Sequence, residues 1–169
     1  MYRPQAFGTE GPALRIYPYS MDSLELQVGA GRLVSYSPAR ELPWRVVFED
    51  EGAAGYCYAC DGRRATVDED FDVTVMDAML VYNVEAMQRE DDGDRKRLLT
   101  VEWSRDGQRA AVRLDGVPQV LIDFEHRESR CRSNFPNFMD DGRNQWRSAD
   151  HAWDDAAMTQ FEEAALTAE

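Results

Sequence analysis

The chain has 169 residues, of which 32 are acidic and 19 are basic, so its formal net charge is −13. This length fits one domain, and 43% hydrophobic residues provide enough apolar side chains for a core. The composition therefore argues against disorder of the whole chain. The negative charge opposes binding to nucleic-acid phosphates and to anionic lipid surfaces, and it favours encounter with a basic partner.

The sequence carries no signal for export or for a membrane. The N-terminal segment has no apolar stretch behind a basic start. No run of about eighteen apolar residues occurs anywhere in the chain. Three cysteines are an odd number and predict no disulfide framework. We therefore expect a soluble, cytoplasmic protein with a single domain (1–169) and no cofactor.

The N-terminal part of the chain predicts short strands joined by loops. Residues 1–30, rich in Gly and Pro, are expected to form an irregular lead-in with one or two short strands. Residues 32–36 alternate as a strand does. The apolar runs 45–49 and 56–60 flank a loop with two glycines, which is the pattern of a β-hairpin. A polar, charged loop follows at 61–72.

The clearest predicted structure lies between residues 98 and 124. Three alternating stretches are separated by Asp-Gly dipeptides at 106–107 and 115–116, which favour tight hairpin turns, so we expect a three-stranded antiparallel meander. Residues 73–87 fit both the period of a strand and that of a helix. Their β-branched and aromatic content favours the strand.

The C-terminal part predicts a loop and then a helix. Residues 125–148 hold several Asn, a Pro and five Arg, and they are expected to form a long ordered loop. Asp150 is a good N-cap for a helix over 151–167, whose apolar stripe would be formed by Trp153, Ala157, Phe161, Ala164 and Ala168. The predicted fold class is α+β and mainly antiparallel. We expect a β-rich core over 45–124, in a single sheet or meander of about six to eight strands, with the helix against it.

Three cysteines and a histidine have the residue types of a zinc site. Cys57 and Cys60 have the C-x-x-C spacing, and His126 with Cys131 would complete the set, although this second spacing is not a usual one. The C-x-x-C motif falls in a predicted strand, where residues three apart point to opposite faces. This placement disfavours both a redox pair and a zinc site. We expect buried structural thiols and no metal.

His126 and His151 are the only histidines, and neither accompanies a recognisable nucleophile motif. An enzyme with an unfamiliar active site would use one of them with a nearby carboxylate such as Asp50 or Asp123. His151 follows Asp150 at the predicted start of the helix. A capping or packing role is more usual than catalysis at such a position.

Acidic residues gather in three short clusters. The clusters lie at 49–51, 68–72 and 91–94. The one at 68–72 begins like a calcium loop, but Val73 stands in place of the required Gly and Met79 in place of the final Glu, so the calcium-loop pattern is not met. We expect the clusters to lie in solvated loops. Their side chains are the candidates for contact with a partner: Glu49, Asp50, Glu51, Asp68, Asp70, Asp72, Asp91, Asp92 and Asp94.

One stretch is locally basic and rich in aromatic residues. Such a mixture suits single-stranded nucleic acid, an acidic protein surface, or pairing with the protein's own carboxylates. We favour internal pairing, and nucleic acid is the least favoured because the overall charge repels phosphates. The stretch interleaves Arg127, Arg130, Arg132, Arg143 and Arg147 with Phe135, Phe138 and Trp146.

Several motifs together resemble a known family. They are FED-x-G-x-x-GY-x-YA at 48–59, Met76-Asp77-Ala78 with Val81-Tyr82-Asn83-Val84, Glu102-Trp103-Ser104, Ile122-Asp123-Phe124, Cys131-Arg132-Ser133-Asn134-Phe135-Pro136 and His151-Ala152-Trp153. Over about residues 45–155 the chain is similar to a family of short bacterial proteins classed only as a domain of unknown function. The resemblance implies a bacterial, cytoplasmic setting and brings no activity.

The charge of −13, the lack of a known catalytic motif and this resemblance favour a non-catalytic protein-binding module. By analogy of size and charge, the expected partner is a basic protein such as a bacterial toxin, which the chain would neutralise as an immunity protein. The alternative is the enzyme with an unfamiliar site. We expect no nucleic-acid partner and no membrane partner.

Overall fold

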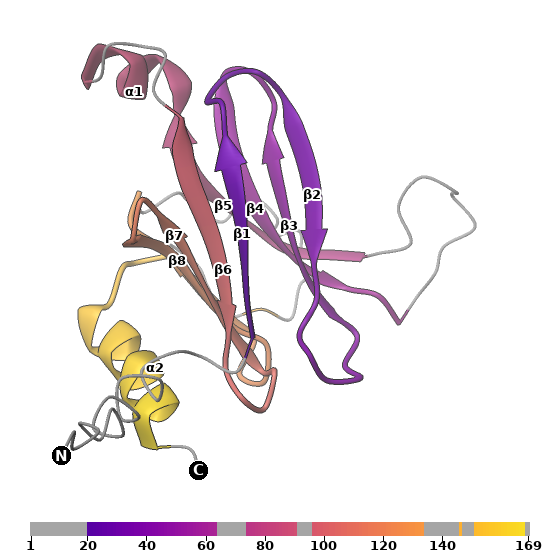
Figure 1. Ribbon diagram of the computed structural model, residues 1–169. Helices are drawn as coiled ribbons and strands as arrows, with labels where there is room; N and C mark the ends of the chain where they lie inside the picture. The colour runs from indigo at the N-terminus through magenta and orange to yellow at the C-terminus, as the bar shows by residue number, and fades with distance from the viewer. Residues whose placement is uncertain (1–19, 64–73, 91–95, 134–145, 147–150, 168–169) are drawn as a thin grey trace, which may run out of the picture.

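The computed structural model describes residues 20–63, 74–90, 96–133, 146 and 151–167. Over these residues the chain forms nine strands and two helices (Figure 1). In chain order they are β1 (Ser20–Leu26), β2 (Arg32–Tyr36), β3 (Trp44–Asp50), β4 (Ala54–Asp61), β5 (Thr74–Asn83), α1 (Val84–Glu90), β6 (Arg97–Trp103), β7 (Arg109–Leu114), β8 (Val117–Asp123), β9 (Glu128–Cys131) and α2 (Asp155–Thr167).

The strands form two antiparallel sheets instead of the single sheet expected. The five-stranded sheet has the order β1-β6-β7-β8-β9, and the four-stranded sheet has the order β2-β3-β4-β5. The mainly antiparallel architecture with a C-terminal helix is confirmed, and so are the β3–β4 hairpin and the β6–β7–β8 meander. The division arises because β1 pairs with the distant β6, whereas β2 pairs with β3.

One hydrophobic core fills the space between the two sheets. Phe48 and Met79 enter it from the four-stranded sheet, and Val101, Trp103 and Ile122 enter it from the five-stranded sheet. All five side chains have no more than a trace of exposed surface. Burial of each stabilises the fold by roughly 1.5–3 kcal/mol, so this core is what holds the sheets face to face.

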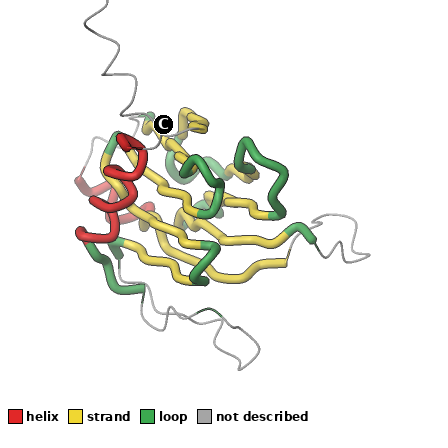
Figure 2. The backbone as a smooth tube through the Cα atoms, turned by 90° about the horizontal axis from the view of Figure 1, so that it is seen from below, coloured by secondary structure: helices red, strands yellow, loops and turns green. Residues whose placement is uncertain are grey.

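Helix α2 covers the outer face of the five-stranded sheet, on one flank of the layered strands (Figure 2). Met158 and Phe161 of the helix pack on Ala111 of β7 and Leu121 of β8. The fold therefore has three layers: the four-stranded sheet, the five-stranded sheet and the helix. Ala168, expected in the apolar stripe, lies outside the described residues.

The helix begins later than expected. His151 has a φ of +51°, in the left-handed region, so the right-handed helix does not include it. Asp154 is the N-cap instead, because its Oδ1 accepts hydrogen bonds from the backbone amides of Ala156 and Ala157. Asp150, the expected cap, lies outside the described residues.

Two further segments differ from the expectation, whereas a short strand expected in the lead-in is present as β1. The predicted loop at 125–148 contains β9, which pairs with β8. Within the segment 73–87, the described residues form β5 up to Asn83 and then the helix α1, whose first turn is capped by the Asn83 side chain accepting from the Ala86 amide. Both periods fitted that segment because each of them holds over one part of it.

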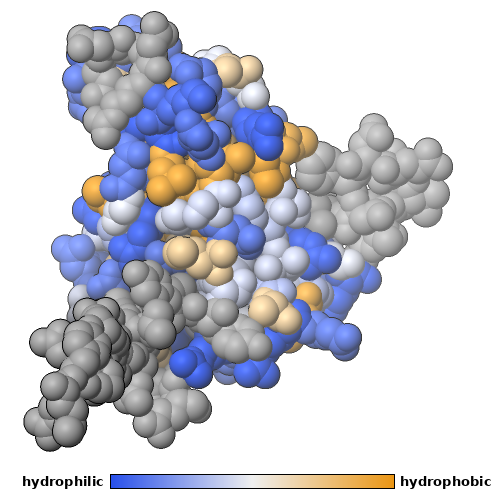
Figure 3. Space-filling view, in the orientation of Figure 1, coloured by the Kyte–Doolittle hydropathy of each residue, from blue (hydrophilic) through white to orange (hydrophobic). Residues whose placement is uncertain are grey.

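The surface is largely hydrophilic. On the face drawn in Figure 3, apolar surface gathers mainly below and beside α1. Among the described residues, the exposed large apolar side chains are Met21, Leu33, Val75, Leu98 and Val117. Neither helix in the described ranges is long and apolar enough to cross a membrane.

Candidate functional site

His151, one of the two candidate catalytic histidines, is buried where β5 lies beside β9 and the two sheets meet. Its Nε2 is 2.8 Å from Oδ2 of Asp77, and the Ser129 hydroxyl donates to the same oxygen at 2.6 Å. The backbone amide of Ala78 donates to the other carboxylate oxygen. The side chains of His151 and Asp77 have no exposed surface, so this cluster is sealed from solvent.

The cluster has the residue types of a serine-hydrolase triad but a different geometry. In such a triad the histidine connects the serine to the carboxylate, whereas here Asp77 is the group that contacts both Ser129 and His151. His151 is also absent from the lining of the pocket described below. The cluster therefore joins β5, β9 and the segment before α2, which is a structural role.

His126 lies on the surface after β8, in the contact with Asp123 that the sequence suggested. Its Nδ1 is 2.8 Å from Oδ2 of Asp123, and its backbone amide donates to Oδ1. The hydrogen bond and the charge of Asp123 raise the pKa of His126 above its usual value. At neutral pH this pair holds more of the histidine in the protonated form than a free side chain would.

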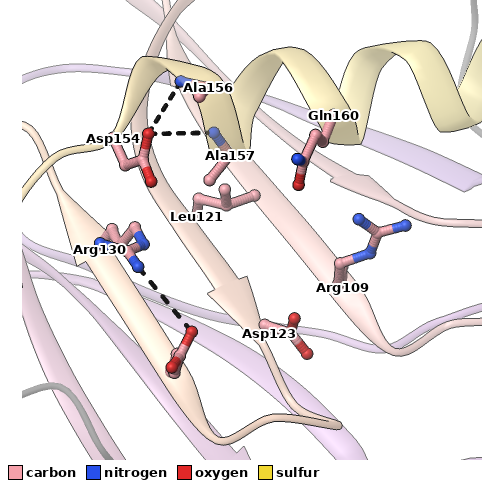
Figure 4. A pocket seen from close by; sticks show the side chains of 9 residues that line it. Arg109, Leu121, Asp123, Arg130, Asp154, Ala156, Ala157 and Gln160 are labelled. Atoms are coloured by element: carbon pink, nitrogen blue, oxygen red, sulfur yellow. Dashed lines mark hydrogen bonds and ion pairs between the residues drawn. The ribbon is translucent and has the colours of Figure 1, made fainter.

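Asp123 also lines a pocket of about 220 Å³ between the outer face of the five-stranded sheet and the first turns of α2 (Figure 4). The sheet supplies its floor and the helix supplies its opposite wall. The lining residues are Arg109, Leu121, Asp123, Glu128 and Arg130 from the strands, and Asp154, Ala156, Ala157 and Gln160 from the helix and its cap.

The strand register sets the pattern of charge in the pocket. Arg109, Asp123 and Glu128 lie opposite one another across β7, β8 and β9, and Leu121 and Arg130 pair in the adjoining row. Two guanidinium groups therefore share the pocket with the carboxylates of Asp123, Glu128 and Asp154. Such a mixed lining can hold a ligand that bears both signs of charge.

The first acidic cluster does not lie wholly in a solvated loop, contrary to the expectation. Asp50 is the last residue of β3, and only 3% of it is exposed. Its carboxylate accepts hydrogen bonds from Tyr82 and from the backbone amides of Gly29 and Gly52. Burial acts to raise the pKa of Asp50, but these hydrogen bonds together outweigh it and lower the pKa.

The neighbours of Asp50 in this cluster differ in their exposure. Glu49 is half-buried and accepts a hydrogen bond from the Tyr58 hydroxyl at 2.8 Å, whereas Glu51 is exposed. Of the three, Glu51 is therefore the side chain most open to a partner. The remaining candidates lie outside the described residues: Asp68, Asp70, Asp72, Asp91, Asp92 and Asp94.

The FED-x-G-x-x-GY-x-YA motif is explained by these contacts. Gly52, with a φ of +99°, makes the turn between β3 and β4. A Cβ on Gly55 would lie 2.5 Å from the ring of Tyr82, so only glycine lets that ring reach Asp50. Tyr56 and Tyr58 stack on each other with their ring centroids 6.3 Å apart. The motif therefore encodes a hairpin and its anchor.

The cysteines are buried free thiols, as expected. Burial, with smaller contributions from Cys131 and Cys60, raises the pKa of Cys57, and burial raises the pKa of Cys60 to about 12. Both thiols therefore stay protonated at neutral pH. Within the described part of the chain, no group of three metal-ligating side chains forms, so Cys57, Cys60, His126 and Cys131 are not brought together.

The basic stretch is used internally where the structure describes it. Arg130 donates to the carbonyl of Ala152 and lies 3.9 Å from Glu128. Arg132 donates to the carbonyl of Pro118, and its guanidinium stacks over the ring of Trp153 at 4.6 Å. These contacts agree with the favoured alternative of internal pairing. Arg143, Arg147, Phe135 and Phe138 lie outside the described residues.

Several side chains of these sites were not predicted as site residues, among them Asp77, Ser129, Arg109 and Gln160. Asp77 appeared only within the Met76-Asp77-Ala78 motif of the resemblance, without a role, and Ser129 fell in the predicted loop at 125–148 with no motif around it. Arg109 and Gln160 come from a strand and a helix that are far apart in the chain. A sequence signal existed only for Asp77, since an acid in an otherwise apolar run must find a buried partner.

A family described as an uncharacterised protein conserved in bacteria (DUF2251) has a model that matches residues 26–162. The chain is also similar to an uncharacterised protein of Haemophilus influenzae, with 32% identity over 100 residues. That match covers 59% of this chain and 56% of the relative, so the chain spans just over half the length of that protein. No solved structure matches.

Proposed function

This chain belongs to the matched family of uncharacterised bacterial proteins, and we propose that it is a non-catalytic module that binds a basic protein partner in the cytoplasm. The observation that carries the proposal is the formal net charge of −13. A field of that sign speeds encounter with a positively charged surface and disfavours acidic competitors.

The placement of the reactive side chains supports a binding role. His151 is sealed in the fold, and the thiols of Cys57 and Cys60 are buried with raised pKa values. Two arginines of the basic stretch, Arg130 and Arg132, are engaged with the protein's own groups. The excess of negative charge is thus the main chemical property that the molecule presents to a partner.

The finer proposal is that the partner is a toxin and that this chain is its immunity protein. Bacterial origin, small size and strong acidity support it, with a basic toxin such as a nuclease as the partner of suitable charge. The contact residues would be Glu51 and the acidic clusters at 68–72 and 91–94. Asp50 is excluded from this set because its carboxylate is buried and holds the β3–β4 turn.

Co-expression with the product of the adjacent gene tests this proposal. We expect rescue of growth, a stable one-to-one complex, and an association rate that falls steeply as salt is added. Replacing Asp91, Asp92 and Asp94 by their amides should slow association, and so should the same change at Asp68, Asp70 and Asp72. Glu25→Gln, Glu41→Gln and Glu125→Gln together remove the same charge at exposed positions outside these clusters, and this matched control should slow association less. If the experiment shows no growth rescue and no complex, the proposal is refuted.

A second candidate function is acid–base catalysis by His126. It is favoured by one observation, the 2.8 Å contact of His126 with Asp123, which itself lines the pocket. A screen of hydrolysable esters, amides and phosphates, run in parallel on the wild type and His126→Ala, tests it. Activity that persists in His126→Ala, or no activity in either protein, would reject this candidate.

A further inference from the structure

The pocket between the five-stranded sheet and helix α2 is called the α2 pocket below. Several of its charged groups already bind other groups of the protein. Asp123 pairs with His126 through both carboxylate oxygens. Arg130 is held by the carbonyl of Ala152 and by Glu128. These contacts use part of the hydrogen-bonding capacity of Asp123 and Arg130, so these groups shape the pocket and are not its free binding elements.

Arg109 and Gln160 differ from these groups. Within the described ranges, neither side chain makes a hydrogen bond, and the guanidinium of Arg109 has no carboxylate within ion-pair distance, although its charge helps to lower the pKa of Asp106. In Figure 4 the two side chains lie on the same side of the pocket. A guanidinium and an amide N–H placed together form a binding site for a carboxylate.

Asp154 supplies the opposite charge on the other side of Leu121 (Figure 4). Its Oδ1 caps the helix by accepting from the amides of Ala156 and Ala157, while Oδ2 has no partner among the described residues. A carboxylate oxygen that remains available in this position attracts an ammonium group. Leu121 and Ala157 form the apolar surface between the two ends.

A ligand with one sign of charge would fit this lining poorly. A simple anion on Arg109 would lie near Asp123, Glu128 and Asp154, and a simple cation on Asp154 would lie near Arg130 and Arg109. Repulsion between like charges within one small pocket opposes the binding of such a ligand. A volume of about 220 Å³ admits a molecule of a few carbon atoms.

We propose that the α2 pocket binds a small zwitterion, an amino-carboxylate with a short aliphatic body. Its carboxylate contacts Arg109 and Gln160, its ammonium contacts Oδ2 of Asp154, and its methylene groups lie over Leu121 and Ala157. The lining of this pocket includes none of the residues proposed to contact the protein partner.

The test uses 4-aminobutyrate as the probe. Its binding to the full chain is measured by the NMR shifts of backbone amides and by calorimetry. We expect saturable binding with a dissociation constant of roughly 1 mM or tighter, with shifts centred on the first turns of α2 and on β8. Butyrate, which lacks the ammonium, and butylamine, which lacks the carboxylate, should each bind at least about tenfold more weakly.

Variants of the two charged ends sharpen the test. Arg109→Met should weaken binding of 4-aminobutyrate by about tenfold to a hundredfold, because it removes a charge-assisted contact. Asp154→Asn keeps a good helix cap while removing the charge, so it should weaken binding by about tenfold without unfolding α2. Arg32→Met, on the edge of the other sheet, is the control and should bind as the wild type does.

Three results would overturn the inference. The first is the absence of saturation with both 4-aminobutyrate and the longer 6-aminohexanoate. The second is equal affinity for butyrate or for butylamine, which would identify a site for a single charge. The third is unchanged binding in both Arg109→Met and Asp154→Asn, provided that their circular dichroism matches the wild type.

Discussion

Two aspartate–histidine pairs in this protein have the same nitrogen-to-oxygen distance, but one is buried and the other is exposed to solvent. Asp77 and His151 are 2.8 Å apart with no exposed side-chain surface, at the seam between the sheets. Asp123 and His126 are also 2.8 Å apart, but their side chains are 24% and 63% exposed, beside the α2 pocket. The difference shows that burial, and not contact distance, decides what such a pair contributes.

The physical reason is the cost of removing one partner. A buried polar group that loses its partner cannot turn to water, so the whole desolvation cost remains in the folded state. An exposed group that loses its partner is hydrated at once. The Asp77–His151 pair therefore holds the fold together, whereas the Asp123–His126 pair is free to titrate.

The largest expected effect follows from breaking the seam pair. Asp77→Ala leaves His151 and Ser129 buried without their shared acceptor, so we expect a loss of about 3–5 kcal/mol in the free energy of unfolding. Urea denaturation followed by tryptophan fluorescence measures it. Asp123→Ala is the control and should leave the midpoint close to that of the wild type. Equal midpoints for both variants would show that burial does not separate the two pairs.

Removing only the serine from the seam should cost less. Ser129→Ala deletes the 2.6 Å hydrogen bond to Asp77 but leaves the contact with His151 in place. We expect a loss of about 1.5–3 kcal/mol, the usual range for a hydrogen bond to a charged group. Ser23→Ala, on an exposed part of β1, serves as the control in the same urea experiment. If Ser129→Ala is as stable as that control, the hydrogen bond of Ser129 to Asp77 does not stabilise the fold.

A still smaller effect is expected on the outer face of the five-stranded sheet. Arg113 of β7 contacts Glu102 at 2.9 Å and Glu162 of α2 at 2.8 Å, which links the helix to the sheet. Glu162 is 48% exposed, so Glu162→Gln, which leaves the more buried Arg113–Glu102 contact in place, should lower the free energy of unfolding by about 1 kcal/mol or less. The loss should shrink further in 1 M salt, whereas that of Asp77→Ala should not. A salt-independent loss would contradict this view of the outer face.

The smallest effect concerns the pH dependence of the surface pair. The folded-state pKa of His126 is raised above 6.5 by Asp123, so its contribution to stability is fully present below that pH. The contribution is then lost as the pH rises through the folded-state pKa. An NMR titration of the His126 ring should give a midpoint above 6.5, returning toward 6.5 in Asp123→Asn. An unshifted midpoint in the wild type would contradict the contact.

The parts of the fold that sequence reasoning predicted are those with local signals. Apolar alternation and Asp-Gly dipeptides indicated the β6–β7–β8 meander, and Asp115 and Gly116 both adopt the positive φ that a tight turn requires. At the other dipeptide only Gly107 has a positive φ. There Ser104 and Asp106 form side-chain hydrogen bonds that organise a longer turn.

The parts that were missed depend on partners distant in the chain. Strand β9 has four residues within an Arg-rich stretch, and it is a strand because β8 offers it an edge. Asp77 and His151 are separated by 74 positions, and the sequence placed a different acid, Asp150, directly beside the histidine. Arg109 and Gln160 line one pocket only because α2 packs on Leu121.

The sequence by itself determined the charge, the strand-forming alternation, the turns of the meander and the presence of a C-terminal helix, because each depends on the order of neighbouring residues. Tertiary structure alone decided the division into two sheets, the burial of Asp50 and Asp77, and the assembly of the α2 pocket. These features depend on which faces pack together, and that is set by the free energy of burying the whole core.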